Sequence, residues 1–272
     1  MQKTLSTIEP FTPQWLDVRE PADKAARDKG LQAMFIDWLN THNTPPKILD
    51  LGAGTGANLR ALYKPNQSWR LVDWDNTLLN EALRRHPQYY VTTHKANLNA
   101  LESLPWDGVT AVTASALFDL TSAQFIDQLV AQLAERKLTL YSTLNYEGSM
   151  RWLPAHPLDA SVERYFNSDQ RRDKGFGPAL GPDACAYLSQ CLTAHGYNVI
   201  LAESPWQLGQ SQRALSVQLI AGIYRALKEQ PLNEAAQLHP TALAHWRQFR
   251  LEHLFNSACY VGHMDLLALP PE

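Results

Sequence analysis

The sequence predicts an α/β protein built on a mostly parallel, doubly wound sheet with helices on both faces. Short apolar runs alternate with segments whose apolar residues recur every three or four positions, a pattern typical of strand–helix–strand units. The run at residues 48–51 leads directly into Gly52, Gly54 and Gly56, where the backbone must turn tightly between a strand and a helix. Such sheets bind ligands at the carboxyl ends of their strands, so this turn marks the expected site.

A helical segment precedes the first strand. From about residue 23 its apolar residues share one helix face: Leu31, Met34, Phe35, Trp38 and Leu39. Pro45 and Pro46 end this helix, because proline disfavours helical backbone before it and has no amide hydrogen to donate. Residues 1–46 are therefore expected to form an N-terminal helical cap beside the sheet.

Strands and helices then alternate along the chain. Seven strands are expected, at residues 48–51, 69–73, 89–93, 109–114, 137–144, 197–202 and 258–269. Helices are expected at residues 58–63, 76–86, 121–134, 183–195, 215–227 and 241–255, several of them opened by a capping Asn, Asp, Ser or Thr. The segment at residues 204–209 is expected to be a loop, and the last strand is expected to run antiparallel to the others.

Residues 145–182 break this alternation and are expected to form an inserted lid over the site. Loops of this length in a compact domain are usually functional or disordered, and the aromatic residues of this one argue against disorder. Arg151, Lys174 and Phe176 are the candidate acceptor-binding residues of the lid. Arg151 and Lys174 would suit an anionic molecule. Arg171 and Arg172 could contribute as well, with a solvated charged loop as their alternative interpretation, whereas Lys174 is favoured because Gly175-Phe176-Gly177 follows it and suggests a shaped turn.

Composition narrows the class of protein. The 272 residues carry a formal net charge of -3, which gives no general attraction to a nucleic-acid backbone. The three cysteines form no CxxC pair and the nine histidines form no metal-binding motif, so free thiols in a reducing compartment and no metal are expected. No apolar run approaches the ~20 residues that span a bilayer. We expect one cytoplasmic domain over residues 1–272, without nucleic acid or membrane as a partner; the oligomeric state is not predicted.

Two carboxylates bear on the ligand of the glycine turn. Asp50 lies just before the first glycine, where a carboxylate would repel a pyrophosphate and attract a cationic ligand. Asp73 ends the next strand, where it can accept hydrogen bonds from both hydroxyls of a ribose. Residues 52–57 also satisfy the loose dinucleotide fingerprint, so an NAD(P)- or flavin-dependent oxidoreductase is the alternative to a protein that binds S-adenosylmethionine.

Taken together, these motifs resemble those of class I S-adenosylmethionine-dependent methyltransferases, whose fold is Rossmann-like. The resemblance is carried by Asp50-Leu-Gly-Ala-Gly-Thr-Gly56, Leu71-Val-Asp73, Ala96-Asn-Leu98 and Val112-Thr-Ala-Ser-Ala-Leu-Phe-Asp-Leu120. It covers residues 45–145 through motifs and the rest through architecture, including the seven strands. Longer strings around residues 15–27, 173–181 and 204–206 are similar to a group of bacterial methyltransferases, but this similarity does not identify the acceptor.

The resemblance implies a role for each matching position. The residues that would bind S-adenosylmethionine are Asp50, Gly52 and Gly54 at its methionine end, Asp73 at its ribose, Trp74, Asn97 and Leu98 at its adenine, and Ser115 beside its sulfonium. At position 97 the family more often has Asp. An arginine before the first strand, Arg19 or Arg27, is the candidate partner of the cofactor carboxylate, with a surface ion pair as the alternative.

The acceptor side is predicted from residues that follow the fourth and fifth strands or lie in the last one. These candidate catalytic residues are Asp119, Asn145, Tyr146 and His263. A helix-start role for Asp119 and a structural hydrogen bond for His263 are the alternatives. The sequence therefore predicts a methyltransferase acting on a small molecule, anionic if Arg151 and Lys174 bind it. Methylation of protein or RNA, and nucleoside binding without catalysis, stay as alternatives.

Overall fold

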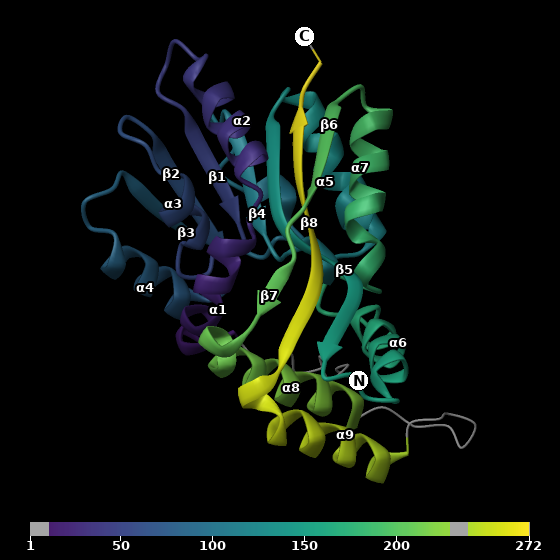
Figure 1. Cartoon of the computed structure of the whole chain (residues 1–272). Helices are drawn as coiled ribbons and strands as arrows, with labels where there is room; N and C mark the ends of the chain where they lie inside the picture. Colours follow the sequence, from purple (N-terminus) through teal and green to yellow (C-terminus); the bar gives the residue numbers. More distant parts are fainter. Residues whose placement is uncertain (1–10, 229–238, 272) are drawn as a thin grey trace, which may run out of the picture.

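The computed structural model describes residues 11–228 and 239–271 and shows one sheet flanked by helices (Figure 1). The strands are β1 (Lys47–Leu51), β2 (Ser68–Asp73), β3 (Val91–Lys95), β4 (Ala111–Ser115), β5 (Thr139–Leu153), β6 (Asn198–Glu203), β7 (Trp206–Leu208) and β8 (Ala258–Leu269). Their order is β3-β2-β1-β4-β5-β8-β6, with β7 paired to β8 off this path. The chain moves outward from β1 to β3 and then returns to β4, so the switch point expected to bind ligands lies between β1 and β4.

The predicted doubly wound, mostly parallel sheet is confirmed. Adjacent strands among β1 to β5 are parallel, and β8 runs antiparallel to β5, β6 and β7. The short β7 is an eighth strand, in a segment where the sequence predicts a loop. That prediction is wrong because Trp206 and Leu208 are buried on either side of exposed Gln207, the period-2 pattern of a half-buried strand.

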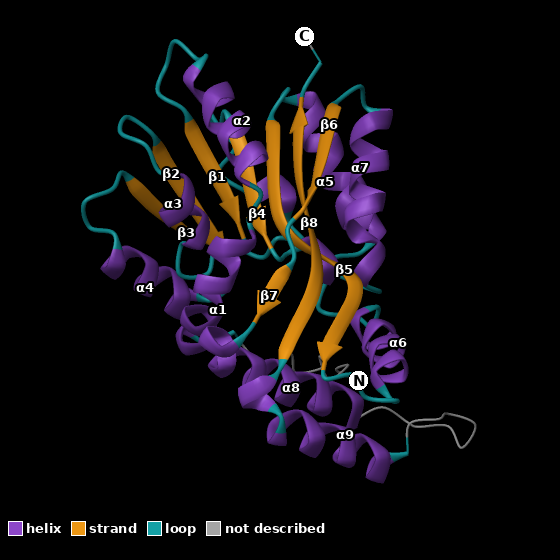
Figure 2. Ribbon diagram, viewed as in Figure 1, coloured by secondary structure: helices purple, strands orange, loops and turns teal. Residues whose placement is uncertain are grey.

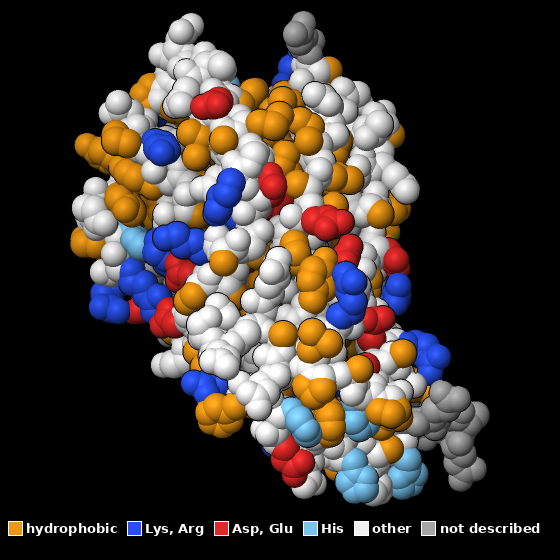
Figure 3. Space-filling model, viewed as in Figure 1, with side chains coloured by type: hydrophobic (Ala, Val, Ile, Leu, Met, Phe, Trp, Pro, Cys, Tyr) orange, Lys and Arg blue, Asp and Glu red, His pale blue; other side chains and the backbone are white. Residues whose placement is uncertain are grey.

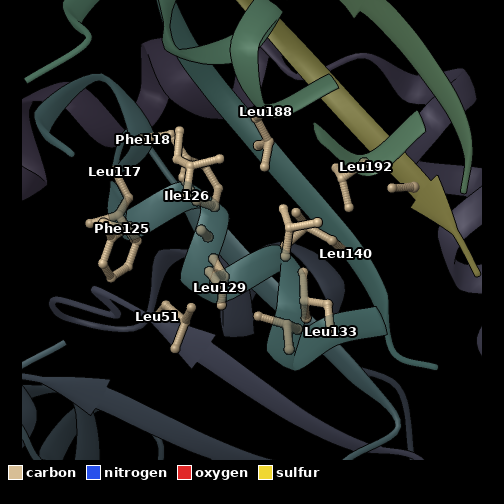
Figure 4. Close-up of a cluster of buried hydrophobic side chains, with 14 of the residues drawn as sticks. Leu51, Leu117, Phe118, Phe125, Ile126, Leu129, Leu133, Leu140, Leu188 and Leu192 are labelled. Atoms are coloured by element: carbon tan, nitrogen blue, oxygen red, sulfur yellow. The ribbon is translucent and has the colours of Figure 1, made fainter. Parts of the chain in front are cut away.

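Helices cover both faces of the sheet (Figure 2). They are α1 (Pro13–Ala26), α2 (Lys29–Asn40), α3 (Ala57–Leu62), α4 (Asn76–Arg85), α5 (Ala123–Glu135), α6 (Asp159–Gln170), α7 (Ala184–Ala194), α8 (Arg213–Lys228) and α9 (Pro240–Glu252). On one face α2 and α3 bury Phe35 and Leu59 with Ile48 of β1. On the other, leucines of α5 and α7, including Leu188, pack around Leu140 of β5 (Figure 4). Burial on both faces explains why the central strands are nearly all apolar.

Two strands continue well past the rest of the sheet. The last part of β5 and the first part of β8, together with β7, form an extension beyond the carboxyl ends of β1 and β4 (Figure 1). Helices α6, α8 and α9 pack on this extension and form a second core around Trp152, Trp246, Ile223 and Val261. Helices α6, α8 and α9 lie below the carboxyl ends of β1 and β4 in the view of Figure 1, so the second core lies on the same side of the sheet as the expected site.

The predicted lid segment, residues 145–182, is more regular than a loop. It begins with the second half of β5 and continues into α6, and a turn follows at residues 171–180. Tyr146, Met150 and Trp152 are buried at even spacing, whereas Glu147 and Arg151 between them are exposed, which is a strand pattern. The expectation of an irregular loop is therefore wrong, whereas the function of the segment as a lid stays a prediction.

The N-terminal cap consists of α1 and α2, separated at residues 27 and 28; the first ten residues lie outside the described part of the chain. Ion pairs of Glu20 with Arg60 (2.5 Å) and of Asp17 with Arg85 (2.5 Å) attach α1 to α3 and α4. They hold α1 across the carboxyl edge of the sheet. No helix in the described ranges is both long enough and apolar enough to cross a membrane.

Candidate functional site

The glycine turn between β1 and α3 lies at the switch point of the sheet and presents its backbone there. Gly52 and Gly54 have φ angles of +63° and +52°, a left-handed conformation that other residues rarely adopt. A Cβ on Gly52 would lie 3.2 Å from a side-chain carbon of Leu117, and one on Gly54 would lie 3.1 Å from Leu16 of α1. Conformation and space therefore both favour glycine at these positions.

Asp50 is fully buried at the end of β1, with one carboxyl oxygen satisfied and the other not. Its Oδ1 accepts hydrogen bonds from Asn58 Nδ2 and Thr113 Oγ1, both at 2.7 Å, whereas its Oδ2 has no partner. Burial raises the pKa of Asp50 to about 6, although the two hydrogen bonds and the charge of Arg27 oppose the shift. A buried carboxyl with an unpaired oxygen suits a ligand that brings an ammonium or N–H donor.

Arg27 lies on the other side of Asn58. Its Nη2 donates to Asn58 Oδ1 at 2.7 Å and to Ser115 Oγ at 3.4 Å, whereas its buried Nη1 has no partner. Asn58 thus links a carboxyl with an unpaired oxygen to a guanidinium with an unpaired nitrogen. We call this set of residues the Asp50 network: Arg27, Asp50, Asn58, Thr113 and Ser115.

The structure distinguishes the two arginines proposed for the cofactor carboxylate. Arg19 donates from Nε and Nη2 to the carboxylate of Asp23, at 2.8 and 3.2 Å, and its guanidinium lies 5.1 Å from the ring centroid of Trp206. Arg27 contacts the ends of β4 and α3 and keeps an unpaired nitrogen. These contacts favour Arg27 as the carboxylate partner, and the cofactor role of Arg19 stays a prediction.

Asp73 ends β2 and lies against the glycine turn. Its Oδ2 accepts from the Gly54 amide at 2.8 Å and its Oδ1 accepts from the Asp75 amide at 2.9 Å. Burial raises the pKa of Asp73 despite these hydrogen bonds. The next side chain, Trp74, is 73% exposed. The end of β2 thus presents a fixed carboxylate beside an uncovered indole, which is the pairing predicted for a nucleoside.

The loop after β3 meets the turn after α6. Asn97 is exposed and accepts from the Asn99 amide at 3.0 Å, whereas Leu98 is buried in the core. Asn99 Nδ2 donates to the carbonyl of Gly175 at 2.8 Å. The two segments predicted to border the adenine and to form the lid are therefore in contact, although they are far apart in sequence.

Asn145 and Asp265 stabilise the junction at which β5 leaves the main sheet. Asn145 is buried, accepts from Ser142 Oγ at 2.9 Å and donates to a β8 carbonyl at 2.9 Å. Asp265 accepts from the amides of Leu144 (2.8 Å) and Asp28 (2.9 Å). Asn145 thus has partners for both ends of its amide within the sheet, and its predicted contact with an acceptor stays a prediction.

Two of the predicted acceptor-binding residues make contacts of their own. The guanidinium of Arg151 lies 4.6 Å from the ring centroid of Tyr260 on the extension. Phe176 packs edge-on against Phe125, with ring centroids 5.0 Å apart, and joins the core beneath α5. Neither contact tests the predicted roles, which stay predictions.

Asp119 lies in a short turn after β4 and is only 9% exposed, with no partner for Oδ1. Burial raises the pKa of Asp119 to about 6, against the effects of its own amide and of the charges of Arg19 and Lys174. Lys174 Nζ donates to Asp169 at 3.0 Å. Lys174 and Arg19, the two cations near Asp119, are therefore each paired with another carboxylate. Asp119 itself has no cation as a partner among the described residues.

His263 of β8 lies between two aromatic rings, with centroids 5.0 Å from Trp206 and 6.0 Å from Tyr146. Its Nδ1 is 3.0 Å from the Val261 carbonyl, which can only accept, so Nδ1 carries the hydrogen and Nε2 keeps its lone pair. Burial and, to a smaller extent, the charge of Arg19 lower the pKa of His263 to about 4. The imidazole is therefore neutral at pH 7.

Tyr146 completes this second set of residues. Its hydroxyl donates to Asn167 of α6 at 2.8 Å, and its pKa is raised by burial and then by the charges of Glu163 and Asp119. The charges of Arg19 and Lys174 act on Asp119, and the charge of Asp119 acts on Tyr146. Asp23 and Trp206 contact Arg19, and His263 contacts Tyr146. We call these seven linked residues the Asp119 cluster: Arg19, Asp23, Asp119, Tyr146, Lys174, Trp206 and His263. Three of the four predicted catalytic residues belong to it.

The sequence did not single out the residues that hold the predicted ones in place: Asn58, Thr113, Trp206 and Asp265. Asn58 carries a signal that was available, because a polar side chain just inside the helix after a glycine turn faces the site. Asp23 also carries a signal, because it lies four residues after Arg19, the spacing of an ion pair on one helix face. The contacts of Trp206 and Asp265 leave no local signal, since Trp206 donates to Asp23 of α1 and Asp265 accepts from the amides of Leu144 and Asp28, all of them distant in sequence.

Surface charge, possible metal ligands and cysteines add three further observations. On the face in view in Figure 3, Lys and Arg side chains are interspersed with Asp and Glu. Among the residues that the structure describes, no three His, Cys, Asp or Glu side chains are placed to hold a metal ion. Cys185, Cys191 and Cys259 are free thiols.

Comparison with known proteins finds similarity in structure alone. No family model and no curated protein sequence matches the chain. The YcgJ protein from Bacillus subtilis matches with a TM-score of 0.51 and 12% identity, over 90% of this chain and 100% of its own. Phosphoethanolamine N-methyltransferase 2 from Haemonchus contortus, solved with phosphomonomethylethanolamine and S-adenosylhomocysteine, matches with a TM-score of 0.50 and 14% identity. That match covers 97% of this chain, which spans 59% of the length of the Haemonchus protein.

These matches confirm the fold that the motifs predict, the fold of class I S-adenosylmethionine-dependent methyltransferases. At these levels of identity the similarity establishes the fold, and the function has to be argued from the residues of the site.

Proposed function

We propose that this protein is an S-adenosylmethionine-dependent methyltransferase that acts on a small molecule. The observation that carries the proposal is the Asp50 network, in which Asp50 Oδ2 and Arg27 Nη1 are both buried and unpaired on either side of Asn58. An α-amino acid presents an ammonium and a carboxylate close together, as the methionine end of S-adenosylmethionine does. A pyrophosphate would instead bring negative charge to the buried Asp50, which argues against NAD(P) or a flavin.

The other cofactor contacts follow from the order of the strands. Asp73 would accept hydrogen bonds from the ribose hydroxyls, Trp74 would stack on the adenine, and Asn97 would lie at its edge next to Leu98. Ser115, at the end of β4, would lie beside the sulfonium. When bound, the cofactor supplies the activated methyl group. The chain has to align the acceptor with that methyl group and exclude water.

A small acceptor is proposed because the Asp119 cluster lies among buried side chains between α1, β5, β7 and β8. The cations that favoured an anionic acceptor have partners: Lys174 is paired with Asp169, and Arg151 lies over Tyr260. These contacts lend no support to an anionic acceptor, which stays a prediction from the sequence.

Calorimetry with S-adenosylmethionine and S-adenosylhomocysteine tests the proposal. We expect both nucleosides to bind the wild-type protein and Asp73→Asn to weaken binding by about 10- to 100-fold, because charge-assisted hydrogen bonds contribute about 1.5–3 kcal/mol. Asp75→Asn is the matched control: Asp75 caps α4 by accepting from the Thr77 amide, and asparagine caps equally well. A folded wild-type protein that binds neither nucleoside would contradict the proposal.

A further inference from the structure

The charges in the Asp119 cluster indicate which kind of acceptor the site can bind. Arg19 makes two hydrogen bonds to Asp23, which also accepts from Trp206 Nε1 at 2.9 Å. Lys174 is paired with Asp169, itself buried and also bonded to mostly exposed Arg172. A carboxylate or phosphate entering this cluster would have to compete with these existing carboxylate partners.

Asp119 is in the opposite situation. It is 9% exposed, its Oδ1 is buried without a hydrogen-bond partner, and no cation lies within ion-pair distance of it among the described residues. A buried carboxylate without a partner is costly in free energy, and a ligand that brings a positive charge or an N–H donor removes that cost. Both cations of the cluster are thus paired with other carboxylates, and Asp119 has no cationic partner of its own in the described part of the chain.

The ring of Tyr146 also suits a cation, because the faces of aromatic rings attract positive charge. Tyr146 and Trp206 flank His263, but the ring of Trp206 already lies beside the Arg19 guanidinium. His263 adds no positive charge of its own, because its imidazole is neutral at pH 7, and its Nε2 lone pair can accept an N–H hydrogen bond.

We propose that the methyl acceptor is an amine, bound through its ammonium group by Asp119 and methylated on nitrogen. This inference rests on the proposed function, because it names the acceptor class of the same site. It requires a small molecule with a primary or secondary amine and places Asp119 in direct contact with the reacting nitrogen.

The reaction balances with groups that the chain contains. An ammonium has no lone pair, so Asp119 first takes one proton from the bound ammonium and leaves a neutral amine. The nitrogen lone pair then forms the new N–C bond while the C–S bond of the cofactor breaks, and its electrons stay on sulfur. The product is a methylated ammonium, and the proton on Asp119 passes to solvent. A carboxyl whose pKa is raised toward 6 takes up this proton more readily than an ordinary aspartate does.

Binding of small ions tests the inference without the natural acceptor. The probes are benzylammonium and benzoate, which have similar size and opposite charge, each added to the S-adenosylhomocysteine complex. We expect benzylammonium to raise the melting temperature of the wild-type complex, benzoate to leave it unchanged, and Asp119→Asn to abolish the benzylammonium shift. Asp37→Asn is the matched control, because Asp37 is an exposed carboxylate of α2, and this variant should keep the shift. A shift with benzoate, or none with benzylammonium, would overturn the inference.

The position of the transferred methyl group provides a second, independent test. The protein is incubated with methyl-labelled cofactor and a small-molecule extract, and the labelled product is analysed by mass spectrometry and NMR. We expect the label on an amine nitrogen, with Asp119→Asn slowing transfer at least 100-fold at pH 7 while S-adenosylhomocysteine affinity stays within twofold. A label on oxygen, carbon or sulfur, or an unaffected Asp119→Asn variant, would refute the amine. Absence of nucleoside binding would instead refute the proposed function itself, so the two failures are distinguishable.

Discussion

The two halves of the site are assembled in different ways. Asp50, Asp73 and Ser115 lie at the ends of β1, β2 and β4, which are adjacent in the sheet and come from one stretch of the chain, residues 47–115. The Asp119 cluster instead combines α1, the turns after β4 and α6, and the strands β5, β7 and β8, with members from Arg19 to His263. The carboxyl ends of parallel strands meet at one edge of the sheet, so short motifs at these ends are sufficient to build the first half of the site. The second half exists only when the extension and its own core have formed.

The largest effect is expected from a substitution in the second core, and it tests whether the cofactor half of the site is independent of that core. Trp246 is completely buried, donates from Nε1 to Asp159 at 2.9 Å and packs edge-on against Trp152, with centroids 5.9 Å apart. We expect Trp246→Ala to lower the free energy of unfolding by about 3–5 kcal/mol, measured by urea denaturation. The folded fraction should bind S-adenosylhomocysteine with wild-type affinity. A folded variant that has lost this affinity would show that the halves are not separable.

The next effect tests the uncompensated charge in the second half. The pKa of folded Asp119 is raised to about 6 from 3.8, so the folded state binds the proton more tightly than the unfolded chain does. Protonated Asp119 therefore makes its full contribution to the free energy of unfolding below about pH 4, and this contribution is lost as the pH rises to about 6. The hydrogen bond from its own amide and the charges of Arg19 and Lys174 lower the pKa of Asp119 but do not cancel the effect of burial. The phenol of Tyr146, whose pKa is itself raised, stays uncharged over this pH range.

We accordingly expect Asp119→Asn to be more stable than the wild-type protein by about 2–3 kcal/mol at pH 7–8, and equally stable below pH 4, since each pKa unit corresponds to about 1.4 kcal/mol. Urea titrations between pH 3.5 and 8 measure the difference. The exposed carboxylate of Asp37 provides the control, because Asp37→Asn should show no such pH dependence. A stability difference that does not change with pH would mean that Asp119 is not a buried, unpaired acid.

How much the sequence predicts follows the same division. The glycine turn, Asp50 and Asp73 can be predicted because each is recognised from a few consecutive residues at the end of one strand. The extension is not predicted from the sequence, although Tyr146 and Trp152 have the spacing of residues on one face of a strand. The reason is that the strand with which they pair, β8, begins about a hundred residues later, at Ala258. Individual members of the Asp119 cluster can be suggested from their positions near strand ends. The contacts between these members cannot be predicted from the sequence. Pairings between distant strands leave no local pattern.

A third prediction concerns the boundary between the halves, where Arg27 and Arg19 lie near one another in sequence but in different networks. We expect Arg27→Met to weaken S-adenosylhomocysteine binding by about 10- to 100-fold, because it removes a charge-assisted contact with the carboxylate worth about 1.5–3 kcal/mol. Affinity for 5′-methylthioadenosine, which lacks the amino acid end, should change little. Calorimetry measures both ligands.

Arg19→Met is the matched comparison for this prediction. Arg19 is paired with Asp23 and lies over Trp206, so its removal should alter methyl transfer and leave S-adenosylhomocysteine affinity within about threefold. If Arg19→Met instead reproduces the loss expected of Arg27→Met, with 5′-methylthioadenosine unaffected, the cofactor role predicted for Arg19 is correct and the assignment to Arg27 is wrong.

The smallest effect is expected at the outer edge of the first half. Trp74 is 73% exposed, so Trp74→Ala should leave the free energy of unfolding unchanged within about 0.5 kcal/mol. If its indole stacks on adenine, the substitution weakens binding of S-adenosylhomocysteine and of 5′-methylthioadenosine equally, by about 0.5–1.5 kcal/mol, or two- to tenfold. Trp74→Phe should restore most of the affinity, because an aromatic face is retained. Unchanged affinity for both ligands would identify Trp74 as a surface aromatic, and the adenine would then be held by the loop after β3 alone.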